Sequence, residues 1–309
     1  NYPDIEVKFL KTELTPFTAE LAHGYDAVCA FVSADISNDT IEVLNMCGVK
    51  LILLRCAGFN NVEMETAKKF GIRVFRVPGY SPEAVAEHAM ALALAVNRHL
   101  HKAYVKVREN DFSLNGLMGI NFHGKTAGII GTGKIGAAMA RICHGFGMKI
   151  IAYDVFENPS IKDFTTYVTL DELLAQSDLI SLHCPPTQDT RHIINKKNIE
   201  KMKNGVLLVN TSRGGLINTG DLIEALMARK FAGVGLDVYE EEDEYFFEDK
   251  SNDIITDEDL IRLTSFRNVI LTSHQAFFTR DAMEAIAKVT MENARAVEEG
   301  AELKNQVLP

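Results

Sequence analysis

The sequence predicts an α/β protein of two domains, each built around a mainly parallel β-sheet. Short apolar runs typical of buried strands alternate with helix-like stretches along the whole chain. The chain has 309 residues, which is more than one ordinary domain usually contains. A glycine-rich turn near the middle of the chain joins a strand-like run to a helical run and marks a second α/β series.

The first series contains four candidate strands, connected by helical stretches around Thr40–Cys47 and Val62–Phe70. The candidate strands are Ile5–Leu10, Ala27–Phe31, Leu51–Arg55 and Arg73–Val77.

A turn at Pro78–Pro82 follows the first series, and the second series begins after the glycine-rich turn Asn115–Gly119. Ser81 is a natural N-cap and Pro82 suits the first position of a helix, which we expect to run to roughly Arg108. A final helix is expected over Arg280–Glu299. The second series has the strands Ala127–Ile130, Lys149–Tyr153, Leu179–His183, Gly205–Asn210, Gly233–Leu236 and Asn268–Leu271.

The composition is that of a soluble globular protein. Hydrophobic residues make up 47% of the chain and charged residues 24%, so a large core can form. The net charge of −10 argues against non-specific binding to nucleic acid or to an anionic membrane, because both need a positive field.

Cysteine usage and the termini indicate a cytoplasmic location. The five cysteines are scattered, without a C-x-x-C pair, which is typical of a reducing compartment. The N-terminus lacks the pattern of a signal peptide, and the longest apolar run is too short to span a bilayer. No metal site is expected, since His99 and His101 lie two apart on a helix and face different ways.

The glycine-rich turn reads Gly131-Thr132-Gly133-Lys134-Ile135-Gly136 and predicts a dinucleotide site. Its glycines permit a tight turn, and the helix that follows offers free N–H groups to a pyrophosphate. Asp154 ends the next strand, where a carboxylate accepts hydrogen bonds from ribose hydroxyls and repels a 2′-phosphate. Val155 and Phe156 offer no compensating arginine, so NAD is expected rather than NADP.

Three polar side chains that follow apolar runs form a candidate catalytic group. Arg213 can hold a carboxylate at two points and polarise a neighbouring carbonyl. His274 can move a proton, and a glutamate can hold the histidine ring in place. Glu242 is the candidate glutamate, although it lies in the acidic stretch Glu240–Asp249 and nothing local selects it.

With these residues in place, the chain resembles the D-2-hydroxyacid dehydrogenases, most closely their fermentative D-lactate dehydrogenase branch. The resemblance extends over nearly the whole chain. Its general motifs are Arg55–Val62, Tyr80–His88, Gly131–Gly136, Asn210–Gly214 and Asp237–Glu242. Phe246–Ser251 and His274–Phe277 point to the lactate branch.

The resemblance implies a flavodoxin-like substrate domain of residues 1–78 and 279–309 and a Rossmann-type, doubly wound NAD domain of residues 79–278. It further implies that Arg213 binds the substrate, that His274 is the acid–base and that Glu242 is its partner. Family chains usually begin with a βα unit ahead of Ile5–Leu10, and the sequence does not show that unit.

The same resemblance implies roles for residues around these three. Asp237 would meet the nicotinamide carboxamide. The substrate would also contact the backbone of Ala57 and Gly58, and the side chains of Tyr80 and Phe277. The cofactor cleft would be lined by His183, Cys184, Pro185, Thr190, Thr211 and Ser212.

The function expected from the resemblance is reversible, NADH-dependent reduction of pyruvate to D-lactate between two domains that close over the substrate. Two alternatives stay open. One is another D-2-hydroxyacid dehydrogenase that takes a branched or aromatic 2-oxo acid, and the other is an NAD-binding scaffold similar to C-terminal-binding corepressors. The long helix after Pro82 is expected to contribute to a homo-oligomer, a dimer or a tetramer.

Overall fold

A computed structural model of the chain describes residue 2 and residues 4–308. The chain divides into two compact units. Unit 1 comprises the residues up to Ser81 together with those from Thr279, and unit 2 comprises Pro82–Phe278. The boundaries expected from the sequence, after residues 78 and 278, differ from these by three residues or fewer.

Unit 1 is built on a four-stranded sheet in the order β1-β2-β3-β11. The first three strands are parallel, and β11 runs antiparallel to β3. The strands are β1 (Ala27–Ala30), β2 (Leu51–Leu54), β3 (Arg73–Phe75) and β11 (Gln306–Val307). The helices are η1 (Ala19–Ala22), α1 (Asn38–Met46), α2 (Met64–Lys69) and α10 (Arg280–Glu298).

The central strand β2 is buried on both faces, which explains its uninterrupted apolar sequence. Ile52 and Leu54 pack in a core that includes residues of α1 and α2. Leu51 and Leu53 pack on the other side against Ala294 and Val297 of α10. The last helix therefore belongs to the first unit, although the whole of unit 2 separates them in sequence.

The prediction of a strand over Ile5–Leu10 is wrong. This segment has no regular structure, and Val7, Phe9 and Leu10 are exposed. A strand needs a neighbour for its backbone N–H and C=O groups, and within the described residues no strand pairs with this segment. Its alternation of apolar and polar residues therefore gave a false strand signal.

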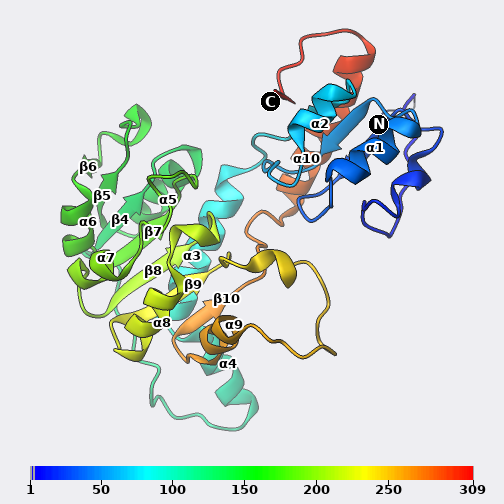
Figure 1. Cartoon of the computed structure of the whole chain (residues 1–309). Coiled ribbons are helices and arrows are strands. Elements are labelled where there is room, and N and C mark those ends of the chain that lie inside the picture. The colour runs from blue at the N-terminus through cyan, green and yellow to red at the C-terminus, as the bar shows by residue number, and fades with distance from the viewer. Residues whose placement is uncertain (1, 3, 309) are drawn as a thin grey trace. The chain divides into compact units, whose positions relative to one another are not determined.

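Unit 2 has a seven-stranded, wholly parallel sheet in the order β10-β9-β8-β7-β4-β5-β6 (Figure 1). Within this sheet the chain enters at the central strand β4 and continues outward through β5 to β6. It then returns to the other side of β4, at β7, and continues outward to β10. The strands are β4 (Thr126–Ile130), β5 (Lys149–Tyr153), β6 (Thr165–Tyr167), β7 (Leu179–Leu182), β8 (Val206–Asn210), β9 (Phe231–Leu236) and β10 (Val269–Leu271).

Helices cover both faces of this sheet. One face carries α3 (Pro82–Asn97) and α5 (Lys134–Gly145), whose alanines pack on β4, β5 and β8. The backbone of α3 lies close to β9, because a Cβ at Gly235 would come within 2.8 Å of the Cβ of Leu92. The other face carries α6 (Leu170–Gln176), α7 (Lys196–Lys201), α8 (Thr219–Met227) and α9 (Glu258–Ser265).

The single helix expected from Pro82 to Arg108 is in fact two. His99 takes a left-handed backbone conformation with φ 49°, and α4 (Leu100–Arg108) begins after it. The side chain of Asn97 exchanges two hydrogen bonds with the backbone of Ile120, at 2.9 and 3.0 Å. This returning segment fixes the end of α3, and sequence periodicity on either side of the break does not reveal it.

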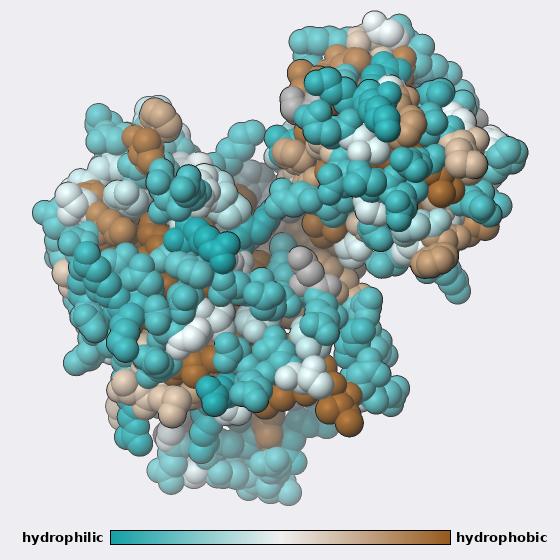
Figure 2. All heavy atoms as spheres, in the orientation of Figure 1, coloured by the Kyte–Doolittle hydropathy of each residue, from teal (hydrophilic) through white to brown (hydrophobic). Residues whose placement is uncertain are grey.

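Polar residues predominate on the face of the molecule seen in Figure 2, and hydrophobic residues form separate small groups on it. Within the described residues, no helix is long and apolar enough to cross a membrane.

Candidate active site

The candidate site lies at the carboxyl ends of the central strands of unit 2. The strand order reverses between β4 and β7, and ligands of open α/β sheets bind at such a reversal. Three segments meet there: the glycine turn after β4, the His183–Cys184 segment after β7, and the Thr211–Arg213 turn after β8.

The glycine turn packs too tightly for other residues at two positions. Gly131 has φ +89°, and a Cβ there would lie 2.4 Å from the backbone nitrogen of Cys184. A Cβ at Gly136 would lie 1.9 Å from the carbonyl oxygen of Gly131. Gly133 is different, because a Cβ there would meet nothing within 4 Å. The first and last glycines of the turn are therefore packed against other protein atoms, whereas the space next to Gly133 is free. At the start of α5, Lys134 is exposed and Ile135 is half-buried.

Asp154, at the end of β5, is tied to this turn. Its carboxylate accepts hydrogen bonds from the backbone N–H of Thr132 at 2.5 Å, from the Thr132 hydroxyl at 3.1 Å and from the N–H of Phe156 at 3.1 Å. Asn158 and Tyr167 also hydrogen-bond to Thr132. These two residues were not predicted, since they follow β5 without any recognisable motif.

Two buried polar atoms in this region have no hydrogen-bond partner, Nδ1 of His183 and Oγ1 of Thr211. Burial lowers the pKa of His183 to about 4, so its imidazole is neutral at neutral pH. Burial raises the pKa of Cys184 to about 11, so this side chain is a thiol and not a nucleophilic thiolate.

The loop after Cys184 is held by its own hydroxyl groups. The Thr190 hydroxyl donates to the carbonyl oxygen of Pro185 at 2.6 Å, and its oxygen accepts from the N–H of Thr187 at 2.7 Å. The hydroxyl of Ser212 donates to the carbonyl oxygen of Cys184 at 2.8 Å and joins this loop to the turn after β8.

These features fit a nicotinamide dinucleotide. The open backbone at Gly133, at the first turn of α5, suits a pyrophosphate. The Asp154 carboxylate suits a ribose, and the unpaired atoms of His183 and Thr211 are buried polar groups that a bound cofactor could satisfy.

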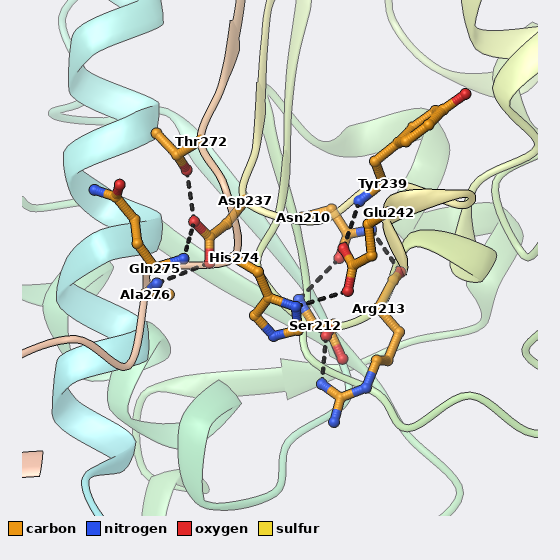
Figure 3. Close-up of polar contacts among 10 residues, drawn as sticks. All are labelled: Asn210, Ser212, Arg213, Asp237, Tyr239, Glu242, Thr272, His274, Gln275 and Ala276. Atoms are coloured by element: carbon orange, nitrogen blue, oxygen red, sulfur yellow. Dashed lines mark hydrogen bonds and ion pairs between the residues drawn. The ribbon is translucent and has the colours of Figure 1, made fainter. Parts of the chain in front are cut away.

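Arg213 is carried by a turn that is stiffened from within. Asn210 donates its amide to the carbonyl oxygen of Arg213 at 2.8 Å and accepts from the N–H of Ser212 at 3.0 Å. One guanidinium nitrogen of Arg213 donates to the carbonyl oxygen of Ser212 at 2.7 Å. In Figure 3 the guanidinium of Arg213 and the imidazole of His274 extend in the same direction.

Glu242 and His274 form a hydrogen-bonded pair in this site. Oε1 of Glu242 lies 2.7 Å from Nδ1 of His274, and Oε2 accepts from the N–H of Tyr239 at 2.9 Å (Figure 3). A carboxylate only accepts hydrogen bonds, so Nδ1 carries a hydrogen and Nε2 is left to exchange a proton with a ligand. The nearby Glu240 has different partners, His192 at 2.6 Å and Thr219 at 3.2 Å.

Asp237 is fully buried. Its carboxylate accepts from the Thr272 hydroxyl at 2.5 Å and from the N–H groups of Gln275 and Ala276 at 2.9 and 2.8 Å (Figure 3). Burial would raise the pKa of Asp237, but hydrogen bonds from His88, Thr272 and the two N–H groups outweigh it and lower the pKa. The carboxylate is therefore ionised at neutral pH.

The remaining expected substrate residues are divided between the two units of the chain. Ala57, Gly58 and Tyr80 belong to unit 1, whereas Phe277 belongs to unit 2 and packs edge-on against Phe278 at 6.1 Å between ring centroids. Within unit 1, Arg76 donates to the carbonyl oxygen of Ala57 at 3.0 Å. Within the described residues, no group of acidic, histidine or cysteine side chains could hold a metal ion.

Comparison with known proteins identifies the family of this chain. Residues 90–276 match the family described as D-isomer specific 2-hydroxyacid dehydrogenase, NAD binding domain. The chain belongs to the D-isomer specific 2-hydroxyacid dehydrogenases. It is 48% identical to a D-lactate dehydrogenase of Escherichia coli over 98% of this chain and 92% of that protein.

Two solved structures of this family illustrate the likeness. The apo-structure of D-lactate dehydrogenase from Escherichia coli has a TM-score of 0.91 at 45% identity and covers 98% of this chain and 92% of its own. D-lactate dehydrogenase from Aquifex aeolicus, complexed with NAD and lactic acid, has a TM-score of 0.86 at 34% identity and covers 99% and 93%. As a member of this family, the chain is an NAD-dependent dehydrogenase with a Rossmann-type domain.

Proposed function

We propose that the protein is a D-lactate dehydrogenase that reduces pyruvate to D-lactate with NADH and runs the reverse reaction with NAD. The observation that carries the proposal is the 2.7 Å Glu242–His274 pair, which leaves Nε2 of the imidazole available for proton transfer. Two relatives that are 48% and 49% identical to this chain are named D-lactate dehydrogenase, which supports pyruvate as the substrate.

Arg213 binds the substrate in this proposal. Its guanidinium is always cationic and can hold the pyruvate carboxylate while polarising the adjacent carbonyl. Asn210 donates a hydrogen bond to the backbone of Arg213 and fixes the turn, so the side chain of Arg213 extends from a fixed backbone. The backbone of Ala57 and Gly58 and the side chains of Tyr80 and Phe277 are proposed to complete the substrate contacts.

His274 supplies the proton. When NADH is bound, its nicotinamide provides the hydride that reduces the carbonyl carbon. The protonated imidazole of His274 gives the Nε2 proton to the oxygen that becomes the hydroxyl of lactate. Glu242 stabilises the imidazolium beforehand, and in lactate oxidation the neutral imidazole takes the proton back. The balance is one hydride and one proton added to pyruvate.

The cofactor contacts are proposed from the same geometry. Gly131–Gly136 would hold the pyrophosphate and Asp154 the adenosine ribose, which selects NAD over NADP. His183, Cys184, Pro185, Thr190, Thr211 and Ser212 would line the cofactor cleft, with Asp237 toward the nicotinamide carboxamide.

We also propose that the protein works in the cytoplasm as a homo-oligomer in a fermentative role. The scattered cysteines, among them the buried Cys143 and Cys184, suit a reducing compartment.

The deciding experiment is NADH oxidation by the purified chain with pyruvate, and separately with phenylpyruvate, 2-oxoisocaproate and glyoxylate. Fastest turnover with pyruvate and a D-lactate product would support the proposal. Faster turnover with 2-oxoisocaproate or phenylpyruvate would assign another acid to the same site. Tight NADH binding with negligible turnover on all four acids would favour the scaffold function.

A further inference from the structure

The backbone of His274 has an unfavourable conformation that its neighbours hold in place. Its φ of 52° lies in the left-handed region, which is unfavourable for residues other than glycine. The N–H groups of His274, Gln275 and Ala276 all donate to Asp237, the first to its carbonyl oxygen at 2.7 Å and the others to its carboxylate. Asp237 therefore sets the path of the turn that presents the imidazole.

The carboxylate of Asp237 is a buried charge that needs a donor of its own. No Lys or Arg of the described residues lies within ion-pair distance of it. The basic group beside it is His88 of α3, whose Nε2 lies 3.3 Å from Oδ1 of Asp237 and 3.2 Å from the Thr272 hydroxyl oxygen.

The hydrogen positions follow from this arrangement. The Thr272 hydroxyl lies 2.5 Å from the ionised Asp237 carboxylate and must give its hydrogen to it, since a carboxylate cannot donate. Nε2 of His88 then faces two acceptors, so Nε2 must itself carry a hydrogen. The ring is only partly buried, with 19% of the side chain exposed, and it belongs to a helix packed against β9.

We propose that His88 is a positioning residue for His274, acting through Asp237. Its Nε2–H holds the Asp237 carboxylate in the orientation that receives the turn's N–H groups. The role rests on the proposed function, because His274 is the acid–base residue only in that reaction. His88 lies within the Tyr80–His88 motif of the sequence, but its chemistry was not needed by the predicted mechanism.

The test compares His88→Leu, which removes the donor, with His88→Gln, whose amide can donate from a similar distance. His88→Leu is expected to lower kcat about tenfold or more, because a small misplacement of a catalytic group costs rate. The Kd for NADH and the KM for pyruvate should change much less. His88→Gln should recover most of the lost kcat.

A second readout does not depend on activity. Amide hydrogen exchange should become several-fold faster at Gln275 and Ala276 in His88→Leu, and His88→Gln should restore slow exchange. The matched control is His144→Leu at the end of α5, an exposed histidine stacked on Phe164, which should leave both kcat and this exchange within about twofold.

The outcomes separate the two proposals. If the unsubstituted chain does not reduce pyruvate or another 2-oxo acid, the proposed function fails. If it does, but His88→Leu keeps kcat and slow exchange at 275–276, the positioning role is wrong. An equal loss of kcat in His88→Leu and His88→Gln would also overturn it, since the donor would then be irrelevant.

Discussion

At the residue scale, hydrogen-bond partners distinguish three acidic side chains that are close in sequence. Glu242 binds His274, Glu240 binds His192, and Asp237 binds the backbone N–H groups that follow His274. All three are acceptors, but only Glu242 contacts the ring that would exchange a proton with substrate. The geometry thus assigns separate tasks to three acidic residues that lie within six positions of one another in the sequence.

Glu242→Gln should alter the pH dependence of the reaction more than the fold. The amide oxygen can still accept from Nδ1 of His274, but the negative charge that favours the imidazolium is lost. Pyruvate reduction needs the protonated ring, so its activity should decline at lower pH than in the unsubstituted chain. A pH profile of kcat/KM with pyruvate checks this, and an unchanged alkaline limb would contradict it.

The substitution His274→Ala removes the imidazole itself. Removal of the proton donor should lower kcat by about 10²–10⁴-fold, the range typical of general acid catalysis. NADH binding, measured by fluorescence titration, should stay close to that of the unsubstituted chain. Near-normal turnover would remove the proton-transfer role from His274.

Arg213→Lys should weaken pyruvate binding and turnover together. A lysine keeps the charge but cannot present two N–H groups in the plane of a carboxylate. Steady-state kinetics should show a higher KM and a lower kcat, with unchanged affinity for NADH. Kinetics equal to those of the unsubstituted chain would mean that the fork is not used.

How far the sequence predicted this site can be judged from individual residues. Arg213, Glu242 and His274 were predicted at strand ends, and the structure places Glu242 and His274 in direct contact. The contact between Asp237 and His88 was not predicted, because His88 lies 149 residues away in the chain. Contacts across that separation depend on how α3 packs on β9, which no local pattern encodes.

At the element scale, the glycine turn provides a test in which two positions of one motif behave differently. Gly136→Ala places a Cβ 1.9 Å from a backbone oxygen, so the turn must shift and thermal stability should fall. Gly133→Ala meets nothing in the protein and should leave Tm nearly unchanged. It should still weaken NADH binding, because its methyl group would occupy the space proposed for the pyrophosphate.

Thermal melting and NADH titration of the two variants are the measurements. Equal effects of both substitutions on Tm would mean that the turn is looser than the structure shows. Normal NADH affinity in Gly133→Ala would move the pyrophosphate away from the start of α5.

The elements also show where periodicity succeeds and fails. The parallel strands of unit 2 other than β6 were predicted because each is a largely apolar run bounded by turn residues. The short strand β6 and the antiparallel strand β11 were missed, since three and two residues give too little periodicity. Pairing with β5 and β3 defines these strands, and pairing is a property of the folded sheet.

At the scale of the whole molecule, the segment formed by α4 and the loop after it exposes many apolar side chains. Leu100, Tyr104, Val105 and Val107 lie on α4, and Phe112, Leu114 and Met118 lie on the loop after it. Leu114 and Met118 are 82% and 92% exposed. Exposed apolar residues in one continuous segment are usually covered by a partner, which supports our proposal that two copies associate through residues 100–120.

The double variant Leu114→Asp with Met118→Asp should therefore lower the oligomeric state. Two charges in an apolar contact must be desolvated without partners, which weakens association. Light scattering after size exclusion should show a dimer or larger for the unsubstituted chain and a smaller species for the variant. Met227→Asp on α8, also 70% exposed, is the control and should keep the original mass. A monomeric unsubstituted chain, or an unchanged mass in the double variant, would exclude residues 100–120 as the contact between copies.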